Sequence, residues 1–131
     1  MSRTDLIADA FTIIRNAVKV KKEDTLIPYS KVLLKICEIL KREGYVENFK
    51  EVDLENFKNI KVYLKYDGKK SVLSEIKKVS KPGRRIYVKK ERIPIVLRGY
   101  GIALISTSSN MLTDKEAKTK GIGGEYIGKV W

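Results

Sequence analysis

The sequence contains no histidine, one cysteine and only three prolines among its 131 residues. Without histidine the chain has no imidazole general base, no Ser-His-Asp or Cys-His arrangement and none of the common zinc-site patterns. The single cysteine cannot form a disulfide framework, and Cys37 lies on the apolar stripe of a predicted helix, which favours a small core residue over a nucleophile. We therefore expect a protein that is not an enzyme and that binds no metal and no cofactor.

Long apolar runs are also absent. Residues 102–105 form one of the longest, which is far too short to span a bilayer, and Asp5 and Asp9 interrupt any signal-peptide core. The phosphate-binding and dinucleotide-binding glycine motifs are incomplete, because Gly68-Lys69 and Gly99-x-Gly101 each lack a required glycine. These absences predict a cytoplasmic protein with no membrane partner and no small-molecule substrate.

Positive charge is what the sequence does have, with 28 Lys and Arg residues against 16 Asp and Glu residues. Residues 1–66 carry a net charge of +3, whereas residues 67–131 carry +9, and nine basic residues between Lys77 and Arg98 are opposed by Glu91 alone. Polyanions attract such a surface because each neutralised phosphate releases a condensed counterion. A solubilising face or a general lysine bias is the alternative, but the asymmetry between the halves favours a nucleic acid partner.

Apolar periodicity predicts two helices and a small sheet in the first half of the chain. One helix covers residues 6–18 with Thr4 as its cap, and a second begins after the cap Ser30 and ends just before Gly44. Extended segments are predicted at residues 25–28, 45–49, 60–66 and 71–79. A tight turn at Asp67-Gly68 is predicted to precede the last of these segments. Lys81-Pro82-Gly83 marks the predicted boundary between an N-terminal α/β domain (1–80) and a C-terminal mainly β domain (81–131).

The second half is predicted to be mostly strand, with extended segments at residues 85–88, 102–105 and 125–130. A short helical turn is predicted to contain Pro94. Thr113 and Glu116 have the spacing of a capping box for a helix over residues 114–120, which Gly121 would end. The whole chain is therefore predicted to be an α+β protein of two small domains, the second with one short helix.

A run of small polar side chains separates the strand at 102–105 from the last helix, and it comprises Ser106, Thr107, Ser108, Ser109 and Asn110. Such side chains both donate and accept hydrogen bonds, which suits 2′-hydroxyls, phosphate oxygens and base edges of RNA. The alternative is a Ser/Thr turn that only caps the helix, but one residue suffices for that role.

Two further features accompany this run. In residues 121–125 the glycines permit close approach of another backbone, and Glu125 could order a neighbouring donor or accept from a base amino group. A helix cap followed by a tight return is the alternative. Tyr87 lies in a basic segment with Arg85 and Lys89, so its ring could stack on an unpaired base or face the core.

Taken in order, these motifs resemble the ribosomal small-subunit protein eight family of bacterial type, nearly from end to end. The matching segments are Asp5-Leu6-Ile7-Ala8-Asp9, Ile14-Arg15-Asn16-Ala17, Pro28-Tyr29-Ser30-Lys31, Leu40-Lys41-Arg42-Glu43-Gly44-Tyr45, Ser80-Lys81-Pro82-Gly83-Arg84-Arg85-Ile86-Tyr87, Gly101-Ile102-Ala103-Leu104-Ile105-Ser106-Thr107-Ser108, Thr113-Asp114-Lys115-Glu116-Ala117 and Gly121-Ile122-Gly123-Gly124-Glu125. Ser109 and Asn110 depart from the family pattern, which usually has a Lys-Gly pair after Ser-Thr-Ser.

The resemblance implies a structural constituent of the small ribosomal subunit that binds the central domain of 16S ribosomal RNA directly and aids assembly of the 30S particle. It implies ribosomal proteins five and two of the small subunit as neighbours. The RNA contacts that it implies are Ser106, Thr107, Ser108, Gly124, Glu125, Tyr87, Ser30 and Lys31. The chemistry of the residues adds Asn110, Arg85 and Lys89 to this set.

Two other functions remain open from the residues alone. A DNA-compacting architectural protein would use the same net charge, although the sequence has no evident arm or helix for a DNA groove. A metal-dependent RNA-processing enzyme would need carboxylates such as Asp67 and Glu75 to hold magnesium. A preference for duplex DNA over structured RNA would favour the first, and metal-dependent turnover of RNA would favour the second.

Overall fold

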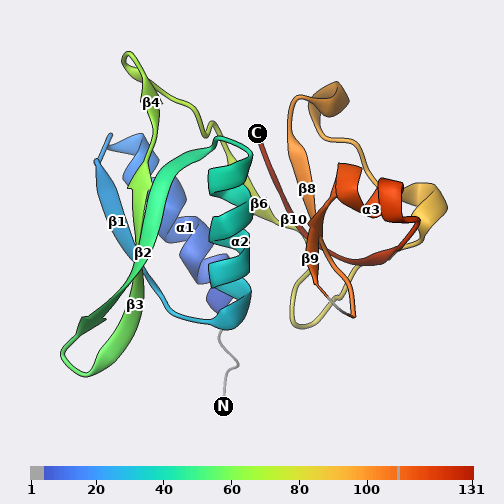
Figure 1. The fold of residues 1–131 in the computed structure, drawn as a ribbon, viewed down its shortest axis with the longest axis horizontal. Helices are drawn as coiled ribbons and strands as arrows, with labels where there is room; N and C mark the ends of the chain where they lie inside the picture. The colour runs from blue at the N-terminus through green and yellow to red at the C-terminus, as the bar shows by residue number, and fades with distance from the viewer. Residues whose placement is uncertain (1–4, 109) are drawn as a thin grey trace. The chain divides into compact units, whose positions relative to one another are not determined.

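The computed structural model describes residues 5–108 and 110–131, and its helices and antiparallel strands confirm the predicted α+β class (Figure 1). The predicted cap Thr4 and the loop residue Ser109 lie outside the described residues. Backbone contacts divide the chain into two compact units, one of residues 6–74 and the other of residues 75–131 together with Asp5. Residues 75–80, which precede the predicted boundary, belong to the same unit as the strands that follow them.

Two amphipathic helices, α1 (Leu6–Lys19) and α2 (Lys31–Arg42), supply much of the core of the first unit. Phe11 and Ile14 of α1 and Leu40 of α2 are among the largest fully buried side chains, as apolar residues three and four apart predict. The Ser30 hydroxyl accepts a hydrogen bond from the Leu33 N–H at 3.0 Å, so the predicted cap of α2 is confirmed.

The sheet of the first unit has the order β1-β3-β2 and is built from β1 (Asp24–Pro28), β2 (Val46–Leu54) and β3 (Phe57–Leu64). The β2–β3 hairpin continues past the end of β1 to a tight turn at Glu55 and Asn56, where φ is +51° and +71°. β2 and β3 are longer than predicted. Both faces of the outer part of their hairpin are largely exposed, so no alternation of apolar and polar residues marks it as strand in the sequence.

The extended segment predicted at 71–79 is wrong as a single strand. β4 (Tyr66–Asp67) and β5 (Lys70–Ser71) form a small hairpin, and β6 (Ile76–Lys78) lies in the sheet of the other unit. Glu75 and Trp131 exchange backbone hydrogen bonds of 2.8 and 3.0 Å beside β6. The partner strand that fixes β6, β10, is thus fifty or more residues away in the sequence, beyond the reach of a local pattern.

The sheet of the second unit has β10 (Gly124–Val130) at its centre. β8 (Ile102–Ser106) pairs along one side of β10 and is itself paired with β9 (Met111–Thr113). On the other side, β6 pairs with the end of β10 and β7 (Tyr87–Val88) with its start. The strand predicted at 85–88 is shorter than expected, because the Ile86 N–H bonds to the Ser80 hydroxyl instead of to a neighbouring strand. Lys81 and Arg84 bond to each other in a turn just before this segment.

The short helix α3 (Asp114–Lys120) matches its prediction. Thr113 Oγ1 accepts from the Glu116 N–H at 3.2 Å, Glu116 Oε1 accepts from the Thr113 N–H at 3.1 Å, and Gly121 ends the helix with φ of +66°. The helical turn predicted around Pro94 is instead η1 (Lys90–Arg92), a 3₁₀ turn, and a second one is η2 (Leu97–Gly99). Helix η1 ends before the proline because the preceding residue, Ile93, is extended, as residues before proline prefer.

Candidate nucleic-acid interface

Three of the predicted site segments meet at the start of β10. Glu125 pairs with Tyr87 of β7 on one side and with Ser106 of β8 on the other. Close backbone packing makes this arrangement possible, because a Cβ atom added to Gly124 would lie 2.3 Å from the Ser106 carbonyl oxygen. A Cβ atom added to Gly123 would lie 2.2 Å from the Val88 carbonyl oxygen. The glycines of this segment therefore serve the strand packing that brings Ser106 and Tyr87 to Glu125.

The hydroxyl-rich loop after β8 is shaped by two of its members. The N–H and the hydroxyl of Thr107 each donate to the Asn110 carbonyl oxygen at 2.8 Å, and the Asn110 N–H donates to Thr107 Oγ1 at 3.0 Å. Within the described residues the hydroxyls of Ser106 and Ser108 have no hydrogen-bond partner, and Ser108 is exposed. Thr107 and Asn110 thus fix the turn and leave these two serines available to a ligand.

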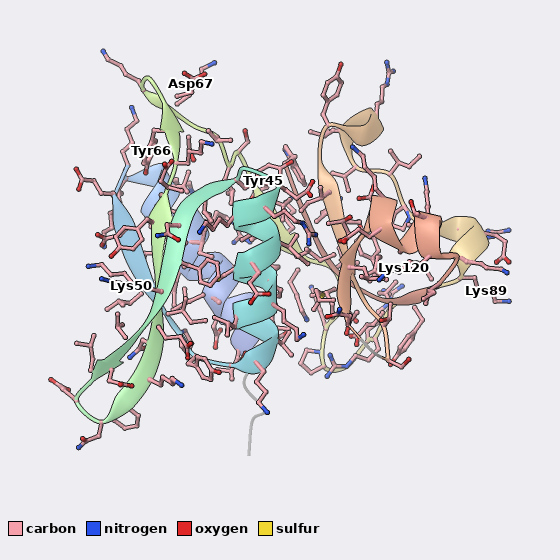
Figure 2. All side chains as sticks on the ribbon, viewed as in Figure 1. Tyr45, Lys50, Tyr66, Asp67, Lys89 and Lys120 are labelled. Carbon is pink, nitrogen blue, oxygen red and sulfur yellow. The ribbon has the colours of Figure 1, made fainter. Side chains whose placement is uncertain are left out.

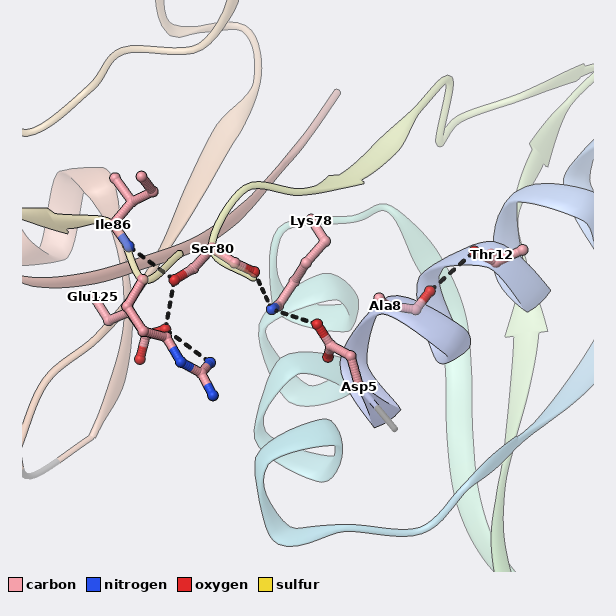
Figure 3. A network of polar contacts seen from close by, with 8 residues as sticks. Asp5, Ala8, Thr12, Lys78, Ser80, Ile86 and Glu125 are labelled. Atoms are coloured by element: carbon pink, nitrogen blue, oxygen red, sulfur yellow. Dashed lines mark hydrogen bonds and ion pairs between the residues drawn. The ribbon is translucent and has the colours of Figure 1, made fainter. Parts of the chain in front are cut away.

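Glu125 is held by a polar network around a buried serine (Figure 3). The Ser80 hydroxyl donates to Glu125 Oε2 at 2.6 Å and accepts from the Ile86 N–H at 3.0 Å, and Arg85 Nη1 lies 3.3 Å from the same Oε2 atom. Ser80 is completely buried, and its carbonyl oxygen accepts from the Lys78 ammonium group. Of the two roles that the sequence leaves open for Glu125, the structure shows the ordering of neighbouring donors, through Oε2.

The surface around this network is cationic and carries an outward aromatic ring. The sequence allows the Tyr87 ring either to stack on a base or to face the core. Tyr87 is 70% exposed, so the core position is wrong. Arg85 and Lys89 are exposed, and Figure 2 shows Lys89 at the periphery of the second unit. Other exposed cations of the same stretch are Lys81, Arg84, Lys90 and Arg92. The unit therefore presents an aromatic ring among cations, which is the combination that binds unpaired bases next to phosphates.

Ser30 and Lys31 belong to the first unit, whereas the other predicted contact residues belong to the second. The Ser30 hydroxyl is engaged as the cap of α2, and Lys31 is exposed at the first residue of that helix. A cation and a helix start form a reasonable phosphate contact, but the described geometry places no other predicted contact residue in this unit.

One residue of the network, Ser80, was not among the predicted site residues. It belongs to the motif at 80–87, yet a single serine beside a Lys-Pro-Gly turn gives no sign that its hydroxyl is buried. In residues 5–108 and 110–131, no three His, Cys, Asp or Glu side chains gather as a metal site would require. No helix in this part of the chain is long and apolar enough to cross a membrane.

Comparison with known proteins gives a consistent result over the full length. The sequence model of the family described as "Ribosomal protein S8" matches residues 5–131. The small ribosomal subunit protein uS8 of Dictyoglomus thermophilum is 51% identical over 131 residues, and that of Dictyoglomus turgidum is 52% identical over 131 residues. The uS8 protein of Syntrophus aciditrophicus is 48% identical over 133 residues. Each of these alignments covers 100% of both chains.

Proposed function

Because this chain belongs to the ribosomal protein S8 family, whose members are structural proteins of the small ribosomal subunit, we propose that it binds the central domain of 16S rRNA directly. In this role it aids assembly of the 30S particle in the cytoplasm and catalyses no reaction. The observation that carries the proposal is the convergence of Ser106, Glu125 and Tyr87 at the start of β10, within the half of the chain that has a net charge of +9.

The proposed mechanism has two stages with different chemistry. Exposed cations such as Lys89 and Arg85 attract the RNA backbone and set the register of the protein on it, with little dependence on sequence. Uncharged hydroxyls then select an irregular stem, because they bond to 2′-hydroxyls and base edges that a regular duplex does not offer in the same arrangement. Ser106 and Ser108 are suited to this step, since their hydroxyls are not used within the described protein.

The remaining proposed contacts extend this surface. Thr107 and Asn110 fix the loop, Gly124 allows its approach to β10, and Lys31 with the capped helix start at Ser30 contacts RNA backbone from the first unit. Ribosomal proteins five and two of the small subunit are the proposed protein neighbours. This part of the proposal rests on membership of the family.

A competition between nucleic acids tests the proposal. The protein is titrated, at one fixed salt concentration, with a 16S central-domain stem that carries the irregular loop, with the same stem fully paired, and with duplex DNA of equal length. We expect the irregular stem to bind at least about a hundredfold more tightly than the other two, as specific recognition requires. Equal binding of the two stems, or a preference for DNA, would contradict the proposal.

A further inference from the structure

We infer that Ser80 is a positioning residue of the proposed RNA site, which holds Glu125 by one carboxylate oxygen and presents the other, Oε1, to a hydrogen-bond donor of the RNA. The donor is a base amino group or a 2′-hydroxyl, since a carboxylate repels phosphate. This inference rests on the proposed function and goes beyond it, because it assigns a role to a residue that does not touch the RNA.

The hydroxyl of Ser80 uses both kinds of bonding capacity that it has. It donates its proton to Glu125 Oε2 at 2.6 Å and accepts the Ile86 N–H at 3.0 Å. Because Ser80 is completely buried, no bulk water can replace either bond. One atom therefore ties the Glu125 side chain to the backbone that leads into β7.

The two oxygens of Glu125 have different surroundings. Oε2 accepts hydrogen bonds from Ser80 Oγ at 2.6 Å and from Arg85 Nη1 at 3.3 Å, and both are drawn as dashed lines to this one oxygen in Figure 3. The hydrogen bonds and the ion pair of the Glu125 side chain within the described residues are on Oε2, which leaves Oε1 as the second acceptor. The side chain is anchored at one oxygen, yet it keeps 19% of its surface exposed and is therefore not sealed from solvent. A preorganised acceptor of this kind loses little entropy when it binds.

The same hydroxyl also holds the backbone next to the residue that carries the exposed ring. Both backbone polar groups of Ile86 are bonded, its N–H to Ser80 Oγ and its carbonyl oxygen to the Tyr126 N–H at 2.8 Å. The next residue is Tyr87, which pairs with Glu125 in the sheet. Ser80 thus links the Glu125 acceptor to the backbone that carries the stacking ring, which suits recognition of a splayed nucleotide.

The test compares two variants that each remove one buried hydroxyl. Ser80→Ala removes the hydroxyl of the network, and Ser71→Ala removes a buried hydroxyl that has no partner in the described part of the chain. We expect Ser80→Ala to lose about tenfold in affinity for the irregular stem, the effect of one charge-assisted hydrogen bond, with no change for the paired stem. The salt dependence should also stay unchanged, because no phosphate contact is removed. Ser71→Ala should behave as the wild type.

A double-mutant cycle separates positioning from a general loss of stability. Glu125→Gln keeps the size of the side chain but removes its charge. If Ser80 acts through Glu125, Ser80→Ala combined with Glu125→Gln should bind the irregular stem no more weakly than the weaker single variant. Losses that simply add, or an equal loss of affinity for both stems, would overturn the inference.

A measurement on the wild-type protein keeps the inference testable even where Ser80→Ala does not fold. Amide hydrogen exchange of Ile86 should be slow in the free protein and unchanged when RNA is added, since its bond to Ser80 exists beforehand. Fast exchange that slows only on binding would overturn the inference. Failure of the proposed function gives a different result. The proposed function is wrong if the wild type does not distinguish the irregular stem from the paired stem. Only the role of Ser80 is wrong if Ser80→Ala distinguishes the two stems as well as the wild type does.

Discussion

The N–H and the side-chain hydroxyl of Thr107 both donate to the carbonyl oxygen of Asn110, each at 2.8 Å. The Thr107 hydroxyl also accepts the Asn110 N–H at 3.0 Å, so it both donates and accepts within the loop. The polar residues of the loop after β8 therefore have two different roles. Thr107 and Asn110 build the turn, and the hydroxyls of Ser106 and Ser108 are left for recognition.

Ser108→Ala should weaken binding of the irregular stem by about 1–3 kcal/mol, because it removes one specific hydrogen bond. Since Ser108 is exposed and its hydroxyl bonds to no described residue, the free energy of unfolding should change by less than about 0.5 kcal/mol. Titration with the irregular stem and with an RNA duplex of random sequence measures the change in binding, and urea unfolding measures the change in stability. Ser74→Ala, at an exposed serine of the first unit, is the control. Unchanged discrimination in Ser108→Ala would show that the recognition loop is wrongly assigned.

Lys89→Ala should weaken the binding of irregular and random RNA by similar factors. The reason is that an exposed lysine near phosphates contributes through counterion release, which is indifferent to sequence. A plot of log affinity against log salt concentration should lose about one unit of slope. Lys50→Ala, at an exposed lysine on β2 of the first unit, is the matched control and should leave the slope as it is (Figure 2). A loss confined to the irregular stem would mean that Lys89 contacts a base instead.

Gly124→Ala should both destabilise the protein and abolish specific binding. The added methyl group would lie 2.3 Å from the Ser106 carbonyl oxygen, so β8 and β10 must separate at the site. We expect a loss of about 1–3 kcal/mol in the free energy of unfolding, the usual cost of overpacking, measured by urea unfolding.

Gly83→Ala is the matched control for this change. A Cβ atom there meets nothing within 4 Å, and the residue has no positive φ. Its stability should be unchanged or slightly higher, since alanine restricts the unfolded chain. Equal stability of Gly124→Ala and Gly83→Ala would contradict the close packing of β8 and β10.

The Cys37 thiol should be unreactive in the folded protein. Burial raises its pKa from an ordinary value of 9.0 to about 12, with a smaller contribution from the Glu38 carboxylate, and the thiolate is the reactive form. Alkylation at pH 8 should therefore be much slower in buffer than in urea. Because the folded pKa lies above the unfolded one, this thiol's contribution to stability is complete below pH 9 and is lost between pH 9 and about 12. Cys37→Ala should lack that component, and equal alkylation rates in buffer and urea would contradict the buried position.

Local signals accounted for the helices. The caps at Ser30 and Thr113 and the end at Gly121 were predictable because each depends on residues within one helical turn. The apolar spacing of α1 and α2 was equally local. The strands were predicted less well, since their ends depend on partners that are distant in the sequence. β6 is separated from β5 because it pairs with β10, and the outer β2–β3 hairpin has no buried face to mark it.

The candidate site shows the same limit. Its polar residues were recognisable as a group by chemistry, but the register that places Glu125 between Ser106 and Tyr87 arises only when three strands pair. The outward position of Tyr87 and the burial of Ser80 are likewise tertiary properties. A basic, hydroxyl-rich sequence thus predicts the kind of ligand, whereas the arrangement of individual side chains needs the fold.

Nucleotide protection in isolated 16S rRNA tests the central claim most directly. Purified protein is added to the RNA, and hydroxyl-radical cleavage is measured at every position with and without it. The account predicts one set of protected nucleotides in the central domain, centred on an irregular stem, that the Ser106→Ala/Ser108→Ala double variant no longer protects. No protection, or weak protection spread along regular helices and equal for both proteins, would contradict it.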